Sequence, residues 1–207
     1  MDEKVMQKLS YGLFVLTTVV GDKDNGCIVN TVTQITASPN RISVAVNKNN
    51  YTAQMILQSK KFTVSVLSTD TNFEIFERFG FQSGKDVDKF KGFTAHFMSP
   101  NGCEYISQGT NAYLCANVKE TLDMGTHYLF IADVTDGKVL SDKPSCTYAY
   151  YHENIKPKPK KNDQGQTVWV CTICGYEYVG EELPDGFICP ICKHPASDFE
   201  KITKITK

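Results

Sequence analysis

Alternating apolar and polar positions run through most of the first 155 residues and predict a mainly β domain. Five segments combine this alternation with β-branched or aromatic residues, which is typical of half-buried strands. They are residues 14–20, 27–32, 42–46, 62–67 and 128–134. Turn-forming residues at 21–26 predict a hairpin between the first two. Short helices are expected at residues 3–9, 51–59 and 72–79. Many strands and few helices favour a closed or partly closed barrel.

The strand pattern stops at a stretch in which lysine and proline alternate. Residues 156–160 read Lys-Pro-Lys-Pro-Lys, and no large apolar residue follows before residue 167. Proline interrupts helices and central strands, so this stretch is expected to be an extended linker. We predict a large domain over residues 1–155, the linker over 156–167 and a small domain over 168–207. The linker lysines fit a solvated spacer or a docking patch for an acidic partner.

Overall composition excludes several classes of partner. The chain has 207 residues, of which 41% are hydrophobic and 22% charged, with a formal net charge of −1. A charge so close to zero gives no general attraction to nucleic acid or to an anionic membrane. The N-terminus lacks the apolar core of a signal peptide, and the longest apolar run is too short to span a bilayer. We therefore expect a cytoplasmic protein.

The eight cysteines fall into two groups. Four are scattered and are expected to be small buried apolar residues, namely Cys27, Cys103, Cys115 and Cys146. The other four form two Cys-x-x-Cys pairs that predict one metal site, with ligands Cys171, Cys174, Cys189 and Cys192. Four thiolates suit tetrahedral zinc or iron. Gly175, placed to turn backbone N–H groups toward sulfur, and the nearby aromatic residues favour iron.

The residues around these pairs resemble rubredoxins. Residues 170–176 and 183–192 are similar to the two metal-binding loops, and residues 192–200 resemble the rubredoxin-like domain of rubrerythrins. The resemblance implies one iron held as Fe(Cys)4 that carries one electron. The spacer between the pairs is shorter than in free-standing rubredoxins, so a structural zinc remains the alternative.

Two polar clusters stand out in the large domain. Hydroxyl and amide side chains crowd both faces of the strand segment 30–39, as the hydrogen-bonding edge of a polar ligand requires. The segment 47–52 places asparagines and a lysine between a strand and a helix, where free backbone N–H groups favour phosphate. Ordinary helix capping with a surface lysine is the other interpretation of the second cluster.

In order along the chain, these clusters resemble the flavin reductase-like, FMN-binding split-barrel family. The similar segments are residues 9–18, 30–39, 47–52, 79–90, 125–134 and 144–151. The resemblance implies a homodimer with FMN near its interface. It assigns isoalloxazine contacts to Asn30, Thr31, Val32, Thr33, Gln34, Thr36, Ala37 and Ser38. It assigns phosphate contacts to Asn47, Lys48, Asn49, Tyr51 and Thr52, and further flavin contacts to Phe81 and Ser83.

His127 is the candidate catalytic residue. The resemblance places it near the flavin and the nicotinamide, whereas a histidine at the start of a strand is also commonly a hydrogen-bonded structural residue. No Gly-x-Gly-x-x-Gly fingerprint follows a strand, so a separate dinucleotide-binding fold is not expected.

A flavin domain joined to a rubredoxin-like domain resembles the architecture of high-molecular-weight rubredoxins. This resemblance implies electron flow from NAD(P)H through FMN to iron, and then to a redox partner such as a flavodiiron protein that reduces oxygen or nitric oxide. Two alternatives stay open. One is an NAD(P)H:flavin reductase with a structural zinc ribbon, and the other is a non-enzymatic flavin and iron electron carrier.

Overall fold

The computed structural model describes residues 5, 8–157, 167–172, 175–190 and 195–202. The helix expected at residues 3–9 lies largely outside the described residues. So do two of the four predicted metal ligands, Cys174 and Cys192.

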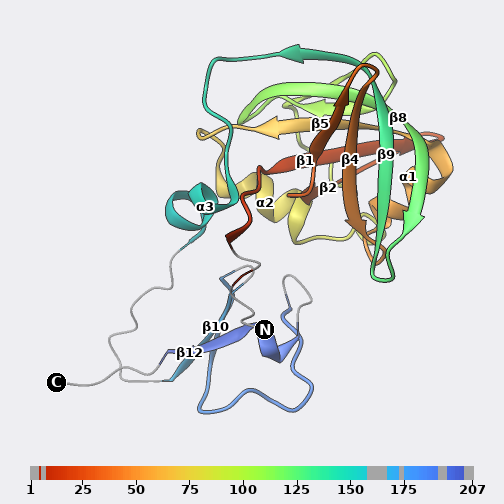
Figure 1. Ribbon diagram of the computed structural model, residues 1–207. Coiled ribbons are helices and arrows are strands. Elements are labelled where there is room, and N and C mark those ends of the chain that lie inside the picture. Colours follow the sequence, from red (N-terminus) through yellow and green to blue (C-terminus); the bar gives the residue numbers. More distant parts are fainter. Residues whose placement is uncertain (1–4, 6–7, 158–166, 173–174, 191–194, 203–207) are drawn as a thin grey trace.

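A curled antiparallel sheet builds the large domain (Figure 1). Its seven strands follow the order β2-β1-β5-β8-β9-β4-β3. Their bounds are β1 Phe14–Val20, β2 Lys23–Val29, β3 Thr33–Ala37, β4 Asn40–Asn47, β5 Lys61–Leu67, β8 Thr110–Asp123 and β9 His127–Val139. Because β2 and β3 remain the two edges, the barrel is split rather than closed. The predicted mainly β fold is therefore confirmed.

Alternation along the strands produces the core. In β4 the side chains of Ile42, Val44 and Val46 are buried, whereas the residues between them are partly exposed. They pack in one cluster with the fully buried Phe62 and Phe130. Each such side chain contributes about 1.5–3 kcal/mol through burial. The period of two that predicted the strands is thus the pattern that fills the barrel.

The long strand β8 was not predicted from the sequence. Its register shifts between Cys115 and Ala116 and again between Val118 and Glu120, so the alternation changes face twice. The first turn is also shorter than predicted. β2 begins at Lys23, and Gly21 has a φ of +58°, the left-handed conformation that glycine adopts without strain.

Three short helices complete the large domain. α1 (Tyr51–Ser59) has the predicted bounds, and α2 (Phe73–Gly80) lies within one residue of its prediction. α3 (Tyr148–Tyr150) continues into a π-helical turn, η2 (Tyr151–Ile155), which was not predicted. A small hairpin pairs β6 (His96–Met98) with β7 (Glu104–Ile106). No helix in the described part of the chain could cross a membrane.

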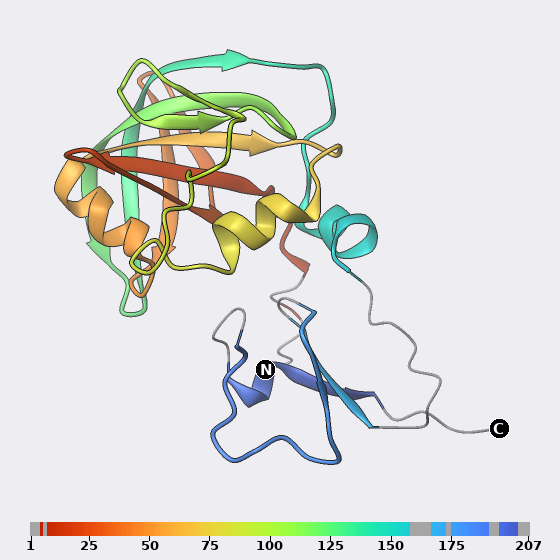
Figure 2. The same cartoon turned by 180° about the vertical axis from the view of Figure 1, so that it is seen from behind.

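The small domain is a three-stranded antiparallel sheet in the order β11-β10-β12. Its elements are β10 Val168–Cys171, β11 Glu177–Val179, the 3-10 helix η3 Ala196–Asp198 and β12 Phe199–Ile202. Both views place it on the side of the barrel that carries α2 and α3 (Figures 1 and 2).

Candidate functional site

A cavity of about 460 Å³ lies where β2, the start of α1 and the loop after α2 meet. Its lining comes from β2, from the β4–α1 connection, from residues 79–84 and from Asp86, Lys89 and Pro195. The volume falls within the usual range of small-molecule sites. Three stretches and two further residues of the large domain, with one residue of the small domain, therefore build one concave site.

The floor of the cavity contains an unsatisfied acceptor. Asn25 is 1% exposed, and its Nδ2 donates to the Thr52 hydroxyl at 3.0 Å. Its Oδ1 is buried without a hydrogen-bond partner among the described residues. A Cβ at Gly84 would stand 2.1 Å from that oxygen, so a larger residue there would collide with it. Because an unpaired buried acceptor costs about 1–3 kcal/mol, the arrangement fits a ligand that donates to Asn25.

The first turn of α1 provides the features of an anion site. Asn50 is the N-cap residue, makes no side-chain cap hydrogen bond, and is followed by a turn without acidic residues. Tyr51 has the Lys23 and Lys85 ammonium groups 4.7 and 5.9 Å from its ring centroid. The positive end of the helix and these cations favour a phosphate at this end of the cavity.

Lys89 is a cavity residue that sequence reasoning did not single out. It is 4% exposed, and its ammonium donates to the carbonyl oxygens of Gly26 at 2.8 Å and Phe79 at 3.0 Å. Burial lowers the pKa of Lys89 to about 8, although the neighbouring Cys27 opposes this shift. The sequence could have indicated Lys89, because it lies within the segment 79–90, which resembles a loop near the flavin.

The cavity gathers the second polar cluster, residues 47–52, and the two further predicted flavin contacts. Six residues of the earlier assignment line it, namely Asn47, Asn49, Tyr51, Thr52, Phe81 and Ser83. Lys48 is not among them. Its ammonium pairs with Asp123 at 2.5 Å and lies 4.8 Å from the ring centroid of Tyr128. The lysine expected at the phosphate is thus engaged elsewhere, and Lys89 is the lysine that lines the cavity.

The strand assigned to the isoalloxazine lies outside this lining. β3 is an edge strand with all five residues exposed, and Gln34 and Thr36 make hydrogen bonds within its own turn. The Thr31 hydroxyl donates to the carbonyl oxygen of Ala45 at 2.7 Å and accepts from its N–H at 3.1 Å. Val32 packs against the barrel core. Within the described part of one chain, β3 is therefore exposed and lines no part of this cavity.

His127 stands at the first position of β9, opposite Asn47 in the strand register. Its Nδ1 lies 2.9 Å from the hydroxyl of the adjacent Thr126. It is therefore close to the β4–α1 connection through its pairing partner, although it does not itself line the cavity.

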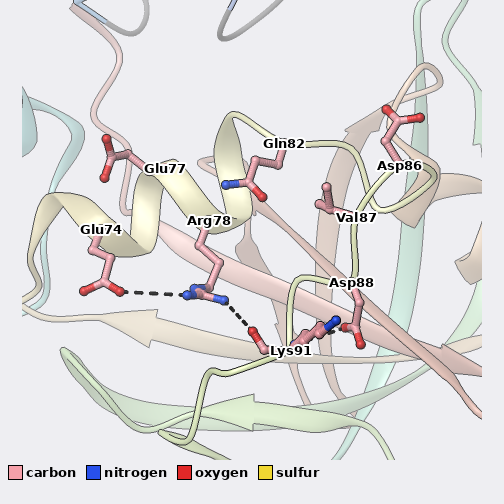
Figure 3. Close-up of a pocket in the computed structure, with 8 residues that line it drawn as sticks. All are labelled: Glu74, Glu77, Arg78, Gln82, Asp86, Val87, Asp88 and Lys91. Carbon is pink, nitrogen blue, oxygen red and sulfur yellow. Dashed lines mark hydrogen bonds and ion pairs between the residues drawn. The ribbon is translucent and has the colours of Figure 1, made fainter.

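A second hollow beside α2 has the opposite electrostatic character (Figure 3). Its lining carries the four carboxylates Glu74, Glu77, Asp86 and Asp88 against the two cations Arg78 and Lys91. The Arg78 guanidinium lies 3.9 Å from Glu74 and donates to the carbonyl oxygens of Lys89 and Lys91. This excess of negative charge disfavours a phosphate, so an anionic cofactor fits the cavity at α1 better.

The small domain buries two of the predicted metal ligands together. Cys171 and Cys189 are 0% exposed and form one cluster with Phe199. The Phe187 ring centroid lies 5.3 Å from that of Phe199, so aromatic rings exclude water from the thiols. Buried soft donors fit iron or zinc. Gly175 has the expected turn conformation, with a φ of +80°, but its N–H donates to the Cys171 carbonyl oxygen at 2.9 Å.

The four scattered cysteines are buried, as predicted. Burial raises the pKa of Cys103 and of Cys146 to about 11, which keeps both thiols protonated and unreactive at neutral pH. The pKa of Cys27 is raised for the same reason. These protonated thiols differ from the cysteines of the Cys-x-x-Cys pairs, which are predicted to bind a metal as thiolates.

Comparison with known proteins covers both parts of the chain. Residues 6–158 match the flavin reductase like domain, and residues 169–200 match the rubrerythrin, rubredoxin-like domain. A high molecular weight rubredoxin of Moorella thermoacetica is 36% identical over 98% of this chain and 100% of its own length. The chain therefore belongs to the flavin reductase-like family and, over its whole length, to the high-molecular-weight rubredoxins.

Two further relatives concern the barrel alone. The ferric-chelate reductase (NAD(P)H) of Archaeoglobus fulgidus is 38% identical over 76% of this chain and 93% of its own. The structure of an NADH:FAD oxidoreductase from Streptomyces globisporus C-1027 superposes with a TM-score of 0.62 at 22% identity, covering 70% of this chain and 84% of that one. At this identity the second likeness shows the fold alone.

Proposed function

We propose that the protein is an electron relay in which NAD(P)H reduces FMN in the barrel and the electrons pass to an iron in the small domain. A bound flavin accepts two electrons as a hydride and releases them singly, and a ferric tetrathiolate accepts one. The observation that carries the proposal is one chain holding a phosphate-favouring cavity and a buried cysteine pair whose surroundings touch at Phe81.

The first turn of α1 is the proposed phosphate site. The Thr52 hydroxyl, oriented by Asn25, and the N–H groups of Tyr51 and Thr52 are the proposed donors. The neighbouring N–H groups of Asn49, Asn50 and Ala53 already donate within the connection. Asn47, Asn49, Tyr51 and Ser83 form the surrounding wall. We place the phosphate of FMN here because the cavity combines these donors with the nearby cations of Lys23 and Lys85.

The exposed strand β3 supports a homodimer. Its five residues present an unpaired sheet edge, which proteins normally cover. In the proposed dimer the segment 30–38 contacts the isoalloxazine near the interface, and His127 positions the nicotinamide. Hydride transfer itself requires no protein base. Sedimentation of the flavin-loaded protein tests this part, because a monomer would leave β3 uncovered and contradict it.

Cys171, Cys174, Cys189 and Cys192 would hold the metal, and iron is the proposed occupant. The water-excluding aromatic rings around Cys171 and Cys189 support an electron-transfer site, since hydration and hydrogen bonds at sulfur set the potential of iron. The final acceptor is proposed to be a flavodiiron protein in the cytoplasm.

The test is a visible spectrum and metal analysis of the purified protein, followed by anaerobic addition of NADH and of NADPH. One FMN and one iron per chain, both bleached by a nicotinamide, would support the relay. Zinc in place of iron, with flavin that is reduced and released, would favour a flavin reductase. Failure of both nicotinamides to bleach the flavin would favour a carrier loaded by another reductase.

The proposed acceptor needs a separate measurement. Reduced protein is mixed anaerobically with a purified flavodiiron protein, and reoxidation of the iron is followed. Fast reoxidation that depends on the concentration of the acceptor would support the pairing, and no reaction would remove this acceptor from the proposal.

A further inference from the structure

The small domain contacts the barrel beside the cavity. Phe81 packs against two buried clusters at once, the barrel cluster around Ile75 and Phe79 and the cluster of Cys171, Cys189 and Phe199. It also lines the cavity, as does Pro195 of the small domain. The views of the two domains agree with this contact, because the small domain lies on the α2 side of the barrel (Figures 1 and 2).

Phe81 is held firmly at this position. It directly follows α2, and its N–H donates to the Glu77 carbonyl oxygen at 3.3 Å. Its ring centroid lies 5.8 Å from that of Phe73, which in turn lies 6.5 Å from that of Phe76. Phe76 is 3% exposed in the barrel core. The barrel therefore holds Phe81 through its backbone and its ring at the place where it meets the small domain.

A second contact joins the start of the linker to the first metal-binding loop. The Lys156 ammonium donates to the Thr172 carbonyl oxygen, next to Cys171. The Pro157 carbonyl oxygen lies 3.4 Å from where a Cβ on Gly175 would stand. Thr172 and Gly175 therefore lie beside the start of the linker, and the cluster that contains Cys171 and Cys189 packs against Phe81 of the barrel.

We propose that this arrangement is the docked state in which the electron crosses, within one chain, from the flavin whose phosphate occupies the cavity to the metal, with Phe81 as the residue that positions the small domain against the barrel. This inference rests on the proposed function. With iron held by Cys171, Cys174, Cys189 and Cys192, a reduced flavin would give one electron to ferric iron and would keep the second until the partner had reoxidised the iron. Intramolecular docking also makes the transfer independent of protein concentration.

The docking contact is tested first without any redox readout. A photo-crosslinking amino acid replaces Gln82, an exposed residue of the cavity lining, in the full-length protein. We expect crosslinks to the peptide that contains Pro195, located by mass spectrometry.

Met98, which is 72% exposed on β6 and outside the cavity lining, is the control position and should give none. Mixing isotope-labelled and unlabelled chains separates crosslinks within a chain from crosslinks between chains. Crosslinks found only between chains, or absent, would overturn the proposal.

The role of Phe81 is tested by anaerobic single turnover with NAD(P)H. The measured quantity is the rate of iron reduction divided by the rate of flavin reduction in the same flavin-loaded sample, so a change in flavin content does not enter. We expect Phe81→Ala to lower this ratio about tenfold, because removing a well-packed aromatic side chain from an interface weakens docking by about this factor. Phe81→Leu should recover most of the ratio. Phe97→Ala, which removes a 55% exposed ring on β6, is the matched control and should leave it unchanged.

The outcomes separate this inference from the function on which it rests. If the wild-type flavin is reduced and the iron is not, the relay itself is wrong and the inference fails with it. If the wild-type iron is reduced but Phe81→Ala keeps the wild-type ratio, the relay stands and this docking route is wrong. An unchanged ratio in Phe81→Ala would refute the route even if Gln82 gave crosslinks.

Discussion

The two domains place their functional residues in opposite ways. The predicted metal ligands Cys171 to Cys192 lie within one short stretch of the small domain, whereas the cavity draws its lining from residues 25 to 89 and from Pro195. Among the described residues of the small domain, few side chains besides Cys171 and Cys189 are buried, but the barrel has two extended hydrophobic clusters. A site made of local ligands must stabilise its own domain, whereas a cavity can depend on a core that folds without it.

The largest expected effect is the loss of one metal ligand. Cys171→Ser should abolish metal retention and unfold the small domain, because metal-binding energy is folding energy in so small a unit. The barrel should keep its flavin and its thermal transition. Metal analysis and calorimetry measure both. The control is Cys146→Ser, at a buried cysteine of the barrel, and this variant should retain one metal per chain. A metal-loaded Cys171→Ser protein would contradict the assignment.

Thr52→Val should affect the barrel alone and to a smaller degree. The substitution removes the hydroxyl that Asn25 orients at the start of α1. Loss of one such hydrogen bond to a phosphate weakens FMN binding about tenfold, equivalent to about 1.4 kcal/mol. Fluorescence titration of flavin-free protein measures the dissociation constant. Gln58→Ala, at an exposed position of the same helix, is the control. Equal affinities for the wild type and Thr52→Val would place the phosphate elsewhere.

Lys89 gives the stability of the barrel a pH dependence of its own. Burial lowers its pKa to about 8 from 10.5. Between these values the unfolded chain binds a proton that the folded chain does not, so the stability of the wild type rises with pH in this window. We expect the free energy of unfolding, relative to Lys89→Met, to increase between pH 8 and 10 by up to about 1.4 kcal/mol per pH unit.

Urea unfolding of flavin-free protein at several pH values measures the effect of Lys89, because a bound anion would change its pKa. A difference between wild type and Lys89→Met that stays constant with pH would show that Lys89 has an ordinary pKa.

The smallest expected effect is that of Lys48→Gln. Lys48 is paired with Asp123 and lies outside the cavity lining, so FMN affinity should be indistinguishable from that of the wild type. Titration under the conditions used for Thr52→Val makes the two results directly comparable. A tenfold weaker affinity would mean that Lys48 leaves Asp123 when the phosphate binds.

The sequence by itself determined the mainly β barrel, the position of α1, the burial of the scattered cysteines and the two Cys-x-x-Cys pairs. The strands, α1 and the Cys-x-x-Cys pairs follow from spacings of two to a few residues, which a linear pattern records directly. The burial of the scattered cysteines follows from the residue type. It also identified the β4–α1 connection, because an asparagine-rich helix start favours anions whatever lies around it.

Tertiary structure alone decided which polar groups share the cavity. Asn25 and Lys89 enter it through the packing of β2 and of the loop after α2, which no local spacing reveals. The strand order likewise places Lys48, after β4, within reach of Asp123 at the end of β8, and it leaves β3 exposed at the edge of the sheet. The contact of Phe81 with the cysteine cluster also joins residues about ninety or more positions apart in the sequence. Such contacts depend on how complete strands and domains pack, and a pattern of neighbouring residues carries no record of them.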